Sequence, residues 1–106
     1  MEKTEMNEQC PECAIKVTPR SPELIKSINN RISRIVGQLG GIKKMIDEGR
    51  YCGDVLLQIS AVESALQNLG YLILQEHMHT CVVERVKEGD MEVLDEALTL
   101  IKKLRI

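Results

Sequence analysis

Three side chains that bind soft metal ions stand out in this sequence: the thiols of Cys52 and Cys81 and the imidazole of His77. His77 and Cys81 are four residues apart, so on an α-helix they lie one turn above each other and could hold one ion from one face. Twenty-five positions separate Cys52 from His77, which is about 37 Å along a helix. The three ligands meet only if a second, antiparallel copy of the helix brings its Cys52 to this pair. The spacing therefore predicts a symmetric dimer with two sites, each built from both subunits.

The donor set of Cys52, His77 and Cys81 also indicates which ion it would hold. Two thiolates and one imidazole form a soft set with few ligands, which suits Cu(I) because that ion accepts low coordination numbers. Zn(II) normally requires a fourth ligand, and Ni(II) favours more nitrogen donors. The sequence therefore favours Cu(I).

The other cysteine pair and the second histidine carry weaker signals. Cys10 and Cys13 form a CPEC motif, whose spacing could chelate a metal or cycle as a dithiol. No second pair or strand context accompanies this motif, so it is either an accessory thiol site or functionally silent. His79 lies about 200° around the helix from both His77 and Cys81, which predicts a surface or interface position.

The composition predicts one small domain with an aliphatic core. The chain has 106 residues, with no Trp, no Phe and only two Tyr. Its formal net charge of −2 is unevenly distributed. Lys and Arg gather between Lys26 and Arg50, whereas acidic residues concentrate near the N-terminus and after Glu84. A weakly acidic protein can still bind nucleic acid through such a local basic face.

The sequence predicts a cytosolic location without membrane contact. No apolar run approaches the ~20 residues of a membrane span, and no signal-peptide pattern opens the chain. In a reducing compartment, four cysteines indicate thiol or metal chemistry rather than structural disulfides.

The chain divides into a tail and three helices. Residues 1–19 are polar and lack apolar periodicity, so we expect a flexible tail before an all-α domain at 20–106. Ser21 is a suitable N-cap for a first helix, Pro22 fits its first position, and Gly49 is suited to end it. Within this helix the apolar residues step alternately by three and four, as in a helix packed lengthwise on another. They are Ile25, Ile28, Ile32, Ile35, Leu39, Ile42 and Ile46.

A second helix is predicted from about Tyr51 to about Glu88, and it is apolar over much of its circumference. The first helix can cover one side of it, so another subunit must cover the rest. Gly89 ends this helix, and Asp90 caps a third, short one. We therefore expect a three-helix subunit with a long antiparallel hairpin, which assembles into an antiparallel bundle dimer.

Three segments carry a family resemblance: NRISRIVGQLGGI in the first helix, RYCGDVLLQISAVESAL at the junction, and EHMHTCV near the end of the second helix. Together they resemble the copper-sensitive operon repressor (CsoR) family over about Ser21 to Lys103. The resemblance implies homodimers, paired into a homotetramer, that bind operator DNA and release it when an inducer binds. Cys52, His77 and Cys81 match the family's cysteine, histidine, cysteine pattern. That match implies a Cu(I)-responsive transcriptional repressor. An enzyme is not expected, because no acid, base and nucleophile converge in one pocket.

Other branches of the family provide alternatives. Nickel-type members are expected to supply a further His at the start of the first helix, and the region around Arg20 contains none. Formaldehyde-responsive members use a proline next to Met1, where this chain has Glu2. A persulfide- or polysulfide-sensing branch needs only the two cysteines, so that alternative stays open although His77 argues against it. Outside the family, the competing hypothesis is a metal buffer that does not bind DNA.

The resemblance also implies roles for residues around the metal and on the first helix. Tyr51 and Glu96 resemble the tyrosine and glutamate that hydrogen-bond the ligating histidine. The spacing from Cys81 to Glu96 is one residue shorter than in typical members. The DNA-binding face is expected on the first helix and just beyond it. Its residues are Arg31, Arg34, Gln38, Lys43, Lys44 and Arg50.

Overall fold

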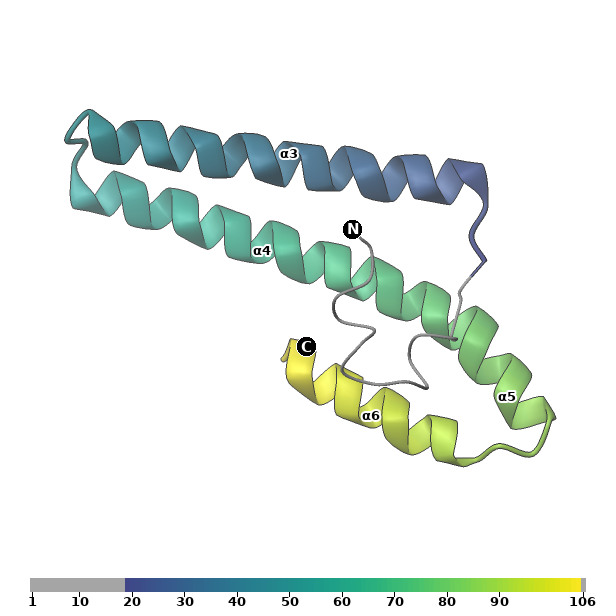
Figure 1. Ribbon diagram of the computed structural model, residues 1–106. Coiled ribbons are helices and arrows are strands. Elements are labelled where there is room, and N and C mark those ends of the chain that lie inside the picture. Colours follow the sequence, from purple (N-terminus) through teal and green to yellow (C-terminus); the bar gives the residue numbers. More distant parts are fainter. Residues whose placement is uncertain (1–18, 106) are drawn as a thin grey trace, which may run out of the picture.

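The computed structural model describes residues 19–105, and its regular elements are helices (Figure 1). They are α3 (Pro22–Asp47), α4 (Cys52–His77), the π-helix η1 (Met78–Val82), α5 (Val83–Lys87) and α6 (Glu92–Leu104). α3 and α4 run side by side in opposite directions, and α6 folds back along α4 after the turn that follows α5 (Figure 1). The predicted all-α subunit with a long antiparallel hairpin is confirmed. Residues 1–18 of the predicted tail, with Cys10 and Cys13, lie outside the described residues.

α3 begins and ends where its sequence predicts. The Ser21 Oγ accepts a 3.1 Å hydrogen bond from the Leu24 backbone N–H, and Pro22 opens the helix. Glu23 places a carboxylate near the positive end of the helix dipole. Beyond the helix, Gly49 has φ +68°, a left-handed conformation that favours glycine and ends helices.

A narrow aliphatic seam holds the two long helices together. Ile35 of α3 is 7% exposed, and Val55 and Val62 of α4 are 7% and 6% exposed. Val55 and Val62 are seven residues apart, which is about two helical turns, so both lie on one side of α4. The hairpin therefore depends on few buried side chains.

A second cluster joins the end of the long helical segment to α6. Val82, Val93 and Ala97 are 2% or 3% exposed and form one buried cluster. Gly70 of α4 lets α6 approach closely, because a Cβ at this position would lie 3.1 Å from Leu104 Cδ2. α6 therefore packs against the C-terminal half of α4.

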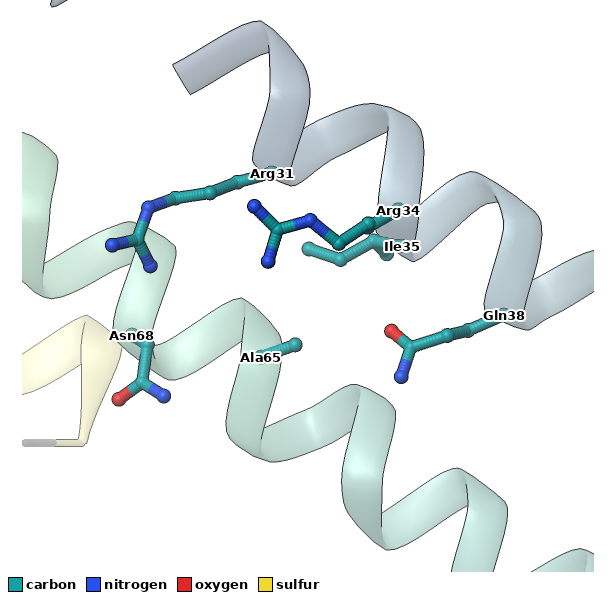
Figure 2. Close-up of a pocket in the computed structure, with 6 residues that line it drawn as sticks. All are labelled: Arg31, Arg34, Ile35, Gln38, Ala65 and Asn68. Carbon is teal, nitrogen blue, oxygen red and sulfur yellow. The ribbon is translucent and has the colours of Figure 1, made fainter. Parts of the chain in front are cut away.

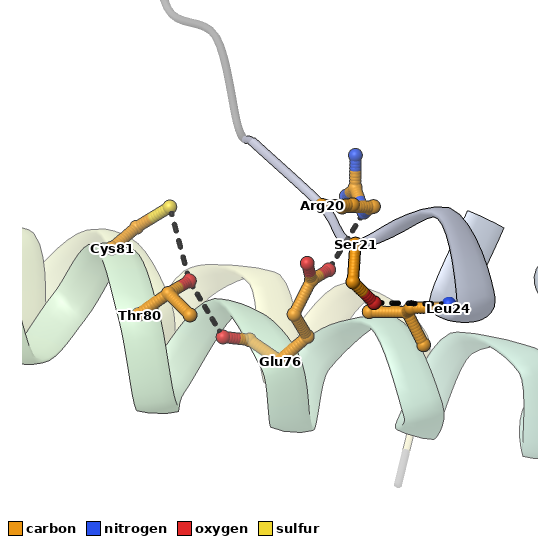
Figure 3. Close-up of polar contacts among 6 residues, drawn as sticks. All are labelled: Arg20, Ser21, Leu24, Glu76, Thr80 and Cys81. Carbon is orange, nitrogen blue, oxygen red and sulfur yellow. Dashed lines mark hydrogen bonds and ion pairs between the residues drawn. The ribbon is translucent and has the colours of Figure 1, made fainter.

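The predicted helix from Tyr51 to Glu88 is not α-helical throughout. Its hydrogen bonding becomes π-helical at Met78–Val82 before α5 continues it. The Thr80 hydroxyl donates a 2.8 Å hydrogen bond to the Glu76 carbonyl oxygen at this point (Figure 3). Side chains that bond to a carbonyl of the preceding turn tend to bend helices. A single π-turn of five residues is too short for the apolar spacing to reveal it, so the sequence pattern does not predict it.

The turn before α6 differs from its prediction in one residue. Gly89 ends α5 with φ +91°, as predicted. The N-cap of α6, however, is Met91 and not Asp90, so that prediction is wrong by one position. The Asp90 carboxylate instead pairs with Arg85 at 3.1 Å and accepts a 3.2 Å hydrogen bond from the Glu92 N–H. It stabilises the turn itself, as aspartate side chains often do.

The subunit leaves large aliphatic side chains exposed on both long helices. Seven apolar residues of the described chain are buried, and none of its large side chains is fully buried. So many large apolar side chains exposed on two paired helices indicate an interface, which supports the predicted second subunit. None of the helices within residues 19–105 has the length and apolar character needed to cross a membrane. On the two long helices, the large apolar side chains that are 39–69% exposed are Ile25, Ile32, Val36, Leu39 and Ile46 of α3, and Leu56, Leu57, Ile59, Leu66 and Tyr71 of α4.

Candidate metal centre and nucleic-acid interface

Cys52 and His77 are the first and last residues of α4 and lie on the same side of it. Their separation of twenty-five residues is about seven full turns, so the helix brings both to one face. Between them, on that face, Leu56, Ile59 and Leu66 are 63%, 39% and 50% exposed. We call these five residues the α4 stripe. The aliphatic side chains of this stripe are exposed in the single subunit, which indicates that another subunit covers them in the assembled protein.

The imidazole of His77 is partly buried and incompletely hydrogen-bonded. Its Nε2 is buried and has no hydrogen-bond partner within the part of the chain that the structure describes. The ring lines a cavity of about 410 Å³ between α4 and α6, which is mainly aliphatic and also lined by Arg20 and Lys103. A buried polar atom without a partner costs about 1–3 kcal/mol. The nitrogen therefore indicates a ligand or a hydrogen-bonding group supplied from outside.

Cys81 lies four residues after His77, inside η1, and its side chain is partly buried. The Thr80 hydroxyl is 3.6 Å from the Cys81 Sγ (Figure 3). Single π-helical turns occur frequently at functional sites. Among residues 19–105, no three His, Cys, Asp or Glu side chains come close enough to hold one ion. One described subunit therefore does not assemble the three predicted ligands, and a Cys52 supplied by a second subunit stays a prediction.

The predicted partners of the imidazole, Tyr51 and Glu96, do not hydrogen-bond the Nε2 of His77 within the described chain. Tyr51 is 74% exposed beside the start of α4, and Glu96 is exposed on α6. The Tyr51 ring lies over Gly53, where a Cβ would be 2.5 Å from the Tyr51 Cε2. Glycine at position 53 therefore makes room for the ring next to Cys52. Both roles stay predictions, and that of Tyr51 requires a second subunit.

The donor chemistry fits Cu(I). The Cys52 thiol is exposed, so a second chain can reach it. His77 offers a ring nitrogen without a partner in residues 19–105. Thiolate sulfur and imidazole nitrogen are the soft and intermediate donors that Cu(I) accepts at low coordination number.

The residues predicted to bind DNA divide into two groups, and the first group surrounds a cavity of about 270 Å³ between α3 and α4. Arg31 and Arg34 reach from α3 towards this cavity in Figure 2. Neither guanidinium forms an ion pair with an acidic residue in the described part of the chain. Two such positive charges beside one hollow favour an anion there. The α3–α4 cavity is lined by Arg31, Arg34, Ile35, Gln38, Ala65 and Asn68.

The second group, Lys43, Lys44 and Arg50, does not line this cavity. Lys44 lies 4.0 Å from Glu48, and Arg50 lies 3.7 Å from Asp54. Both are exposed pairs four residues apart, a type that contributes about 0.3–0.5 kcal/mol. These carboxylates reduce the positive charge available to DNA at Lys44 and Arg50. Their DNA-binding role, like that of Lys43, stays a prediction.

An ion pair that the sequence pattern does not reveal joins Arg20 to the ligand-bearing end of α4. The Arg20 Nε donates a 2.7 Å hydrogen bond to Glu76 Oε1, and the Glu76 side chain is only 10% exposed (Figure 3). Fifty-six positions separate the two residues, and Glu76 directly precedes His77. No local pattern indicates this contact, because it depends on where two distant segments meet. The same holds for Asn68, which joins Arg31 and Arg34 only through the pairing of α3 with α4.

Replacing Glu76 with Gln is expected to lower the free energy of unfolding by about 1–2 kcal/mol. The change keeps the shape of the side chain but removes the charge that Arg20, itself 30% exposed, neutralises. Glu48→Gln is the matched control, because its pair with Lys44 is exposed and should be worth about 0.5 kcal/mol or less. Urea unfolding of both variants measures the difference. Equal losses would contradict the stabilising role of the Arg20–Glu76 pair.

Similarity to known proteins covers most of the chain. A family model described as metal-sensitive transcriptional repressor matches residues 25–103. The chain is 46% identical over 77 residues to the copper-sensing transcriptional repressor CsoR of Bacillus subtilis (strain 168), covering 72% of this chain and 76% of that protein. It is 51% identical over 59 residues to the copper-sensing transcriptional repressor RicR of Mycobacterium tuberculosis (strain ATCC 25618 / H37Rv), covering 56% of this chain and 62% of that protein.

Solved structures share the fold. The crystal structure of the copper-sensing repressor CsoR with Cu(I) from Geobacillus thermodenitrificans NG80-2 has a TM-score of 0.78 at 40% sequence identity, covering 85% of this chain and 95% of that chain. The nickel-responsive transcriptional regulator InrS has a TM-score of 0.67 at 35% identity, covering 83% of this chain and 97% of that chain. These two similar structures therefore belong to proteins that respond to different metals, copper and nickel.

Proposed function

The chain belongs to the metal-sensitive transcriptional repressor family, and on this premise we propose that it is a Cu(I)-responsive repressor that binds operator DNA without metal and releases it when Cu(I) binds. The resemblance to the CsoR family is confirmed by these similarities. The family consists of transcriptional repressors and not of enzymes. Action in the cytoplasm is part of the proposal, since the operator is there.

One observation carries the proposed metal site: the two ends of the exposed α4 stripe hold complementary parts of a soft donor set. The exposed thiol of Cys52 is at one end, and His77, whose Nε2 has no hydrogen-bond partner within residues 19–105, is at the other. Cys81 follows one turn later. If two α4 helices pair antiparallel, each Cys52 meets His77 and Cys81 of the other subunit. The aliphatic residues between them then cover one another.

Cu(I) is favoured over the other inducers by this donor set and by the relatives. The relatives at 46% and 51% identity are both named copper-sensing repressors. A nickel response is less compatible with the chain, because the segment around Arg20 adds no imidazole. A persulfide or polysulfide response is not favoured, because it would leave His77 without a role. A metal buffer without DNA binding is disfavoured by membership of a repressor family.

We propose a homodimer built on α4 and a homotetramer built on α3. The α4 stripe supplies the dimer contact, as the shared metal sites require. The remaining exposed aliphatic residues of α3 then form a second contact between dimers. Ile25, Ile32 and Leu39, which are 45%, 41% and 52% exposed, are central to that second contact.

Metal and DNA would oppose each other through the helices that they share. In the metal-free protein, the two arginines of the α3–α4 cavity contact the DNA backbone. When bound, Cu(I) supplies a link between Cys52 of one subunit and the ligands at the end of α4 in the other. The Arg20–Glu76 pair attaches this end of α4 to the start of α3. Ligands that favour different arrangements of the same helices weaken each other's binding reciprocally.

The proposal is tested by titrating Cu(I) anaerobically into the protein bound to its own promoter DNA and following fluorescence anisotropy. Release should be complete at one Cu(I) per subunit and should be lost in Cys52→Ala. A parallel titration with polysulfide separates the alternatives. Release by polysulfide alone would assign the chain to the sulfur-sensing branch, and no DNA binding would favour a metal buffer.

Replacing His77 with Ala is expected to leave part of the Cu(I) affinity, through the two thiolates, but to remove metal-dependent DNA release. Coupling between two ligands typically amounts to about 1–3 kcal/mol, and this variant should retain little of it. His79→Ala is the matched control, because His79 is an exposed imidazole two residues away. Anisotropy titrations with and without Cu(I) measure the coupling. Full metal-dependent release by His77→Ala would rule out the proposed role of the imidazole.

A further inference from the structure

The α3–α4 cavity combines positive charge, neutral donors and an apolar base in one small space. Its two guanidinium groups, from Arg31 and Arg34, have no acidic partner within residues 19–105. Ile35 and Ala65 form the apolar part of the lining, and its volume is about 270 Å³. An anion of modest size would satisfy the two charges and fit the space. The structure therefore offers a pocket for a group that enters the protein.

From this geometry we infer that the cavity holds one phosphate of the operator backbone, and that Asn68 is the contact that α4 contributes. The inference rests on the proposed function, which supplies the DNA. Beyond the contact of the two arginines with the DNA backbone, it adds that a single phosphate enters the cavity and that a residue outside the predicted DNA-binding face contacts it. Asn68 lines the cavity from α4, and Gln38 lines it from α3. Their amide groups are neutral donors, which can add hydrogen bonds to a phosphate oxygen held by the arginines.

A phosphate suits this cavity better than a base edge does. To read a base edge, side chains must project from the protein into a groove. Here Arg31, Arg34 and Asn68 instead line a hollow, which suits a DNA group that projects towards the protein. The phosphate is the projecting part of duplex DNA and carries the negative charge. Guanidinium groups bind phosphate oxygens in a bidentate manner, and the two arginines are three residues apart on one helix face.

The test measures the affinity of the full-length, metal-free protein for a fluorescent operator duplex. Asn68→Ala should weaken binding about tenfold, as expected for one hydrogen bond to a charged group. Asn68→Asp should weaken it by about thirtyfold or more, because the new carboxylate would pair with the arginines and repel the phosphate. Asn29→Asp is the matched control. It makes the same change of charge at an exposed site about 160° around α3 from Arg31, and it should change affinity less than about threefold.

A second arm identifies the bound group. Neutral methylphosphonates replace the operator phosphates one at a time. The native protein should lose affinity sharply when the methylphosphonate stands at one particular position in each operator half-site. The Asn68→Ala variant should lose clearly less affinity from the replacement at that same position. Circular dichroism checks that the variants keep native helix content.

The outcomes separate this inference from the proposed function. Equal losses for Asn68→Asp and Asn29→Asp, or no effect of either Asn68 variant, would overturn the phosphate pocket while leaving the repressor assignment intact. Altered preference among operator base pairs without altered methylphosphonate sensitivity would show that Asn68 reads a base edge, and would also overturn it. Failure of the native protein to bind its promoter would overturn the proposed function as well.

Discussion

Cys52→Ala and His77→Ala subunits, refolded together in equal amounts, are expected to regain about a quarter of the native Cu(I) sites, although neither variant alone forms a site with all three ligands. About half of the dimers would be hybrids. In each hybrid, one site combines the intact Cys52 of one subunit with the intact His77 and Cys81 of the other. The second site lacks both the Cys52 thiol and the His77 imidazole, so only Cys81 remains there. Anaerobic competition with a chromophoric Cu(I) chelator counts the high-affinity sites.

The matched control is a mixture of native subunits with the double variant Cys52→Ala/His77→Ala. If each site uses both subunits, hybrids of this mixture contain no intact site, so the count falls to about a quarter of that of an all-native sample. If all ligands of a site come from one chain, the control mixture keeps half of the sites of an all-native sample. The mixture of Cys52→Ala with His77→Ala subunits then regains no native site. That pair of results would exclude the antiparallel arrangement of α4.

Replacing Leu66 with Asp is expected to abolish the dimer. Leu66 is 50% exposed in the single subunit and lies close to midway between Cys52 and the His77, Cys81 pair. In the proposed antiparallel pairing it meets its own copy near the symmetry axis. Two carboxylates would then be buried against each other, at a cost of several kcal/mol. A loss of several kcal/mol weakens association by a thousandfold or more, on the order of 1.4 kcal/mol per factor of ten.

Sedimentation velocity at micromolar protein measures this effect, with Gln67→Asp as the control. Gln67 is the next residue along α4 and is already polar and exposed, so a charge there can remain in water. The control should stay assembled. A Leu66→Asp protein that sediments like the native one would show that the α4 stripe is not the dimer contact.

Local signals were sufficient to predict where α3 begins and ends. Ser21, Pro22 and Gly49 define the ends of α3 through interactions within one turn, so the sequence carries them directly. The cap of α6 was wrong by one residue, because Asp90 also pairs with Arg85 and its side chain serves the turn. The π-helical turn at Met78–Val82 was missed, because its five residues are too few for their apolar spacing to reveal the change from i→i+4 to i→i+5 hydrogen bonds.

The candidate sites could be predicted only in part. Residue types and spacing identify Cys52, His77 and Cys81 as ligands, but their meeting depends on a second subunit. The buried state of the His77 nitrogen follows from how α6 returns to α4, which no local pattern specifies. Asn68 could not be predicted as a site residue, because it joins the cavity only when α3 pairs with α4. Arg31 and Arg34, in contrast, were recognisable from their charge alone.

Two of the basic residues predicted to bind DNA are paired with carboxylates within residues 19–105, and this pairing affects how strongly the protein would bind chromosomal DNA away from its operator. Non-specific affinity for DNA grows with the number of phosphates that a protein neutralises, through release of counterions. Lys44 and Arg50 are engaged by acidic neighbours, and the whole chain carries a formal charge of −2. A chromosome offers about 10⁶–10⁹ competing sites, yet each would hold this protein only weakly. Most copies would thus stay unbound and available, so operator occupancy would follow the metal level instead of the amount of surrounding DNA.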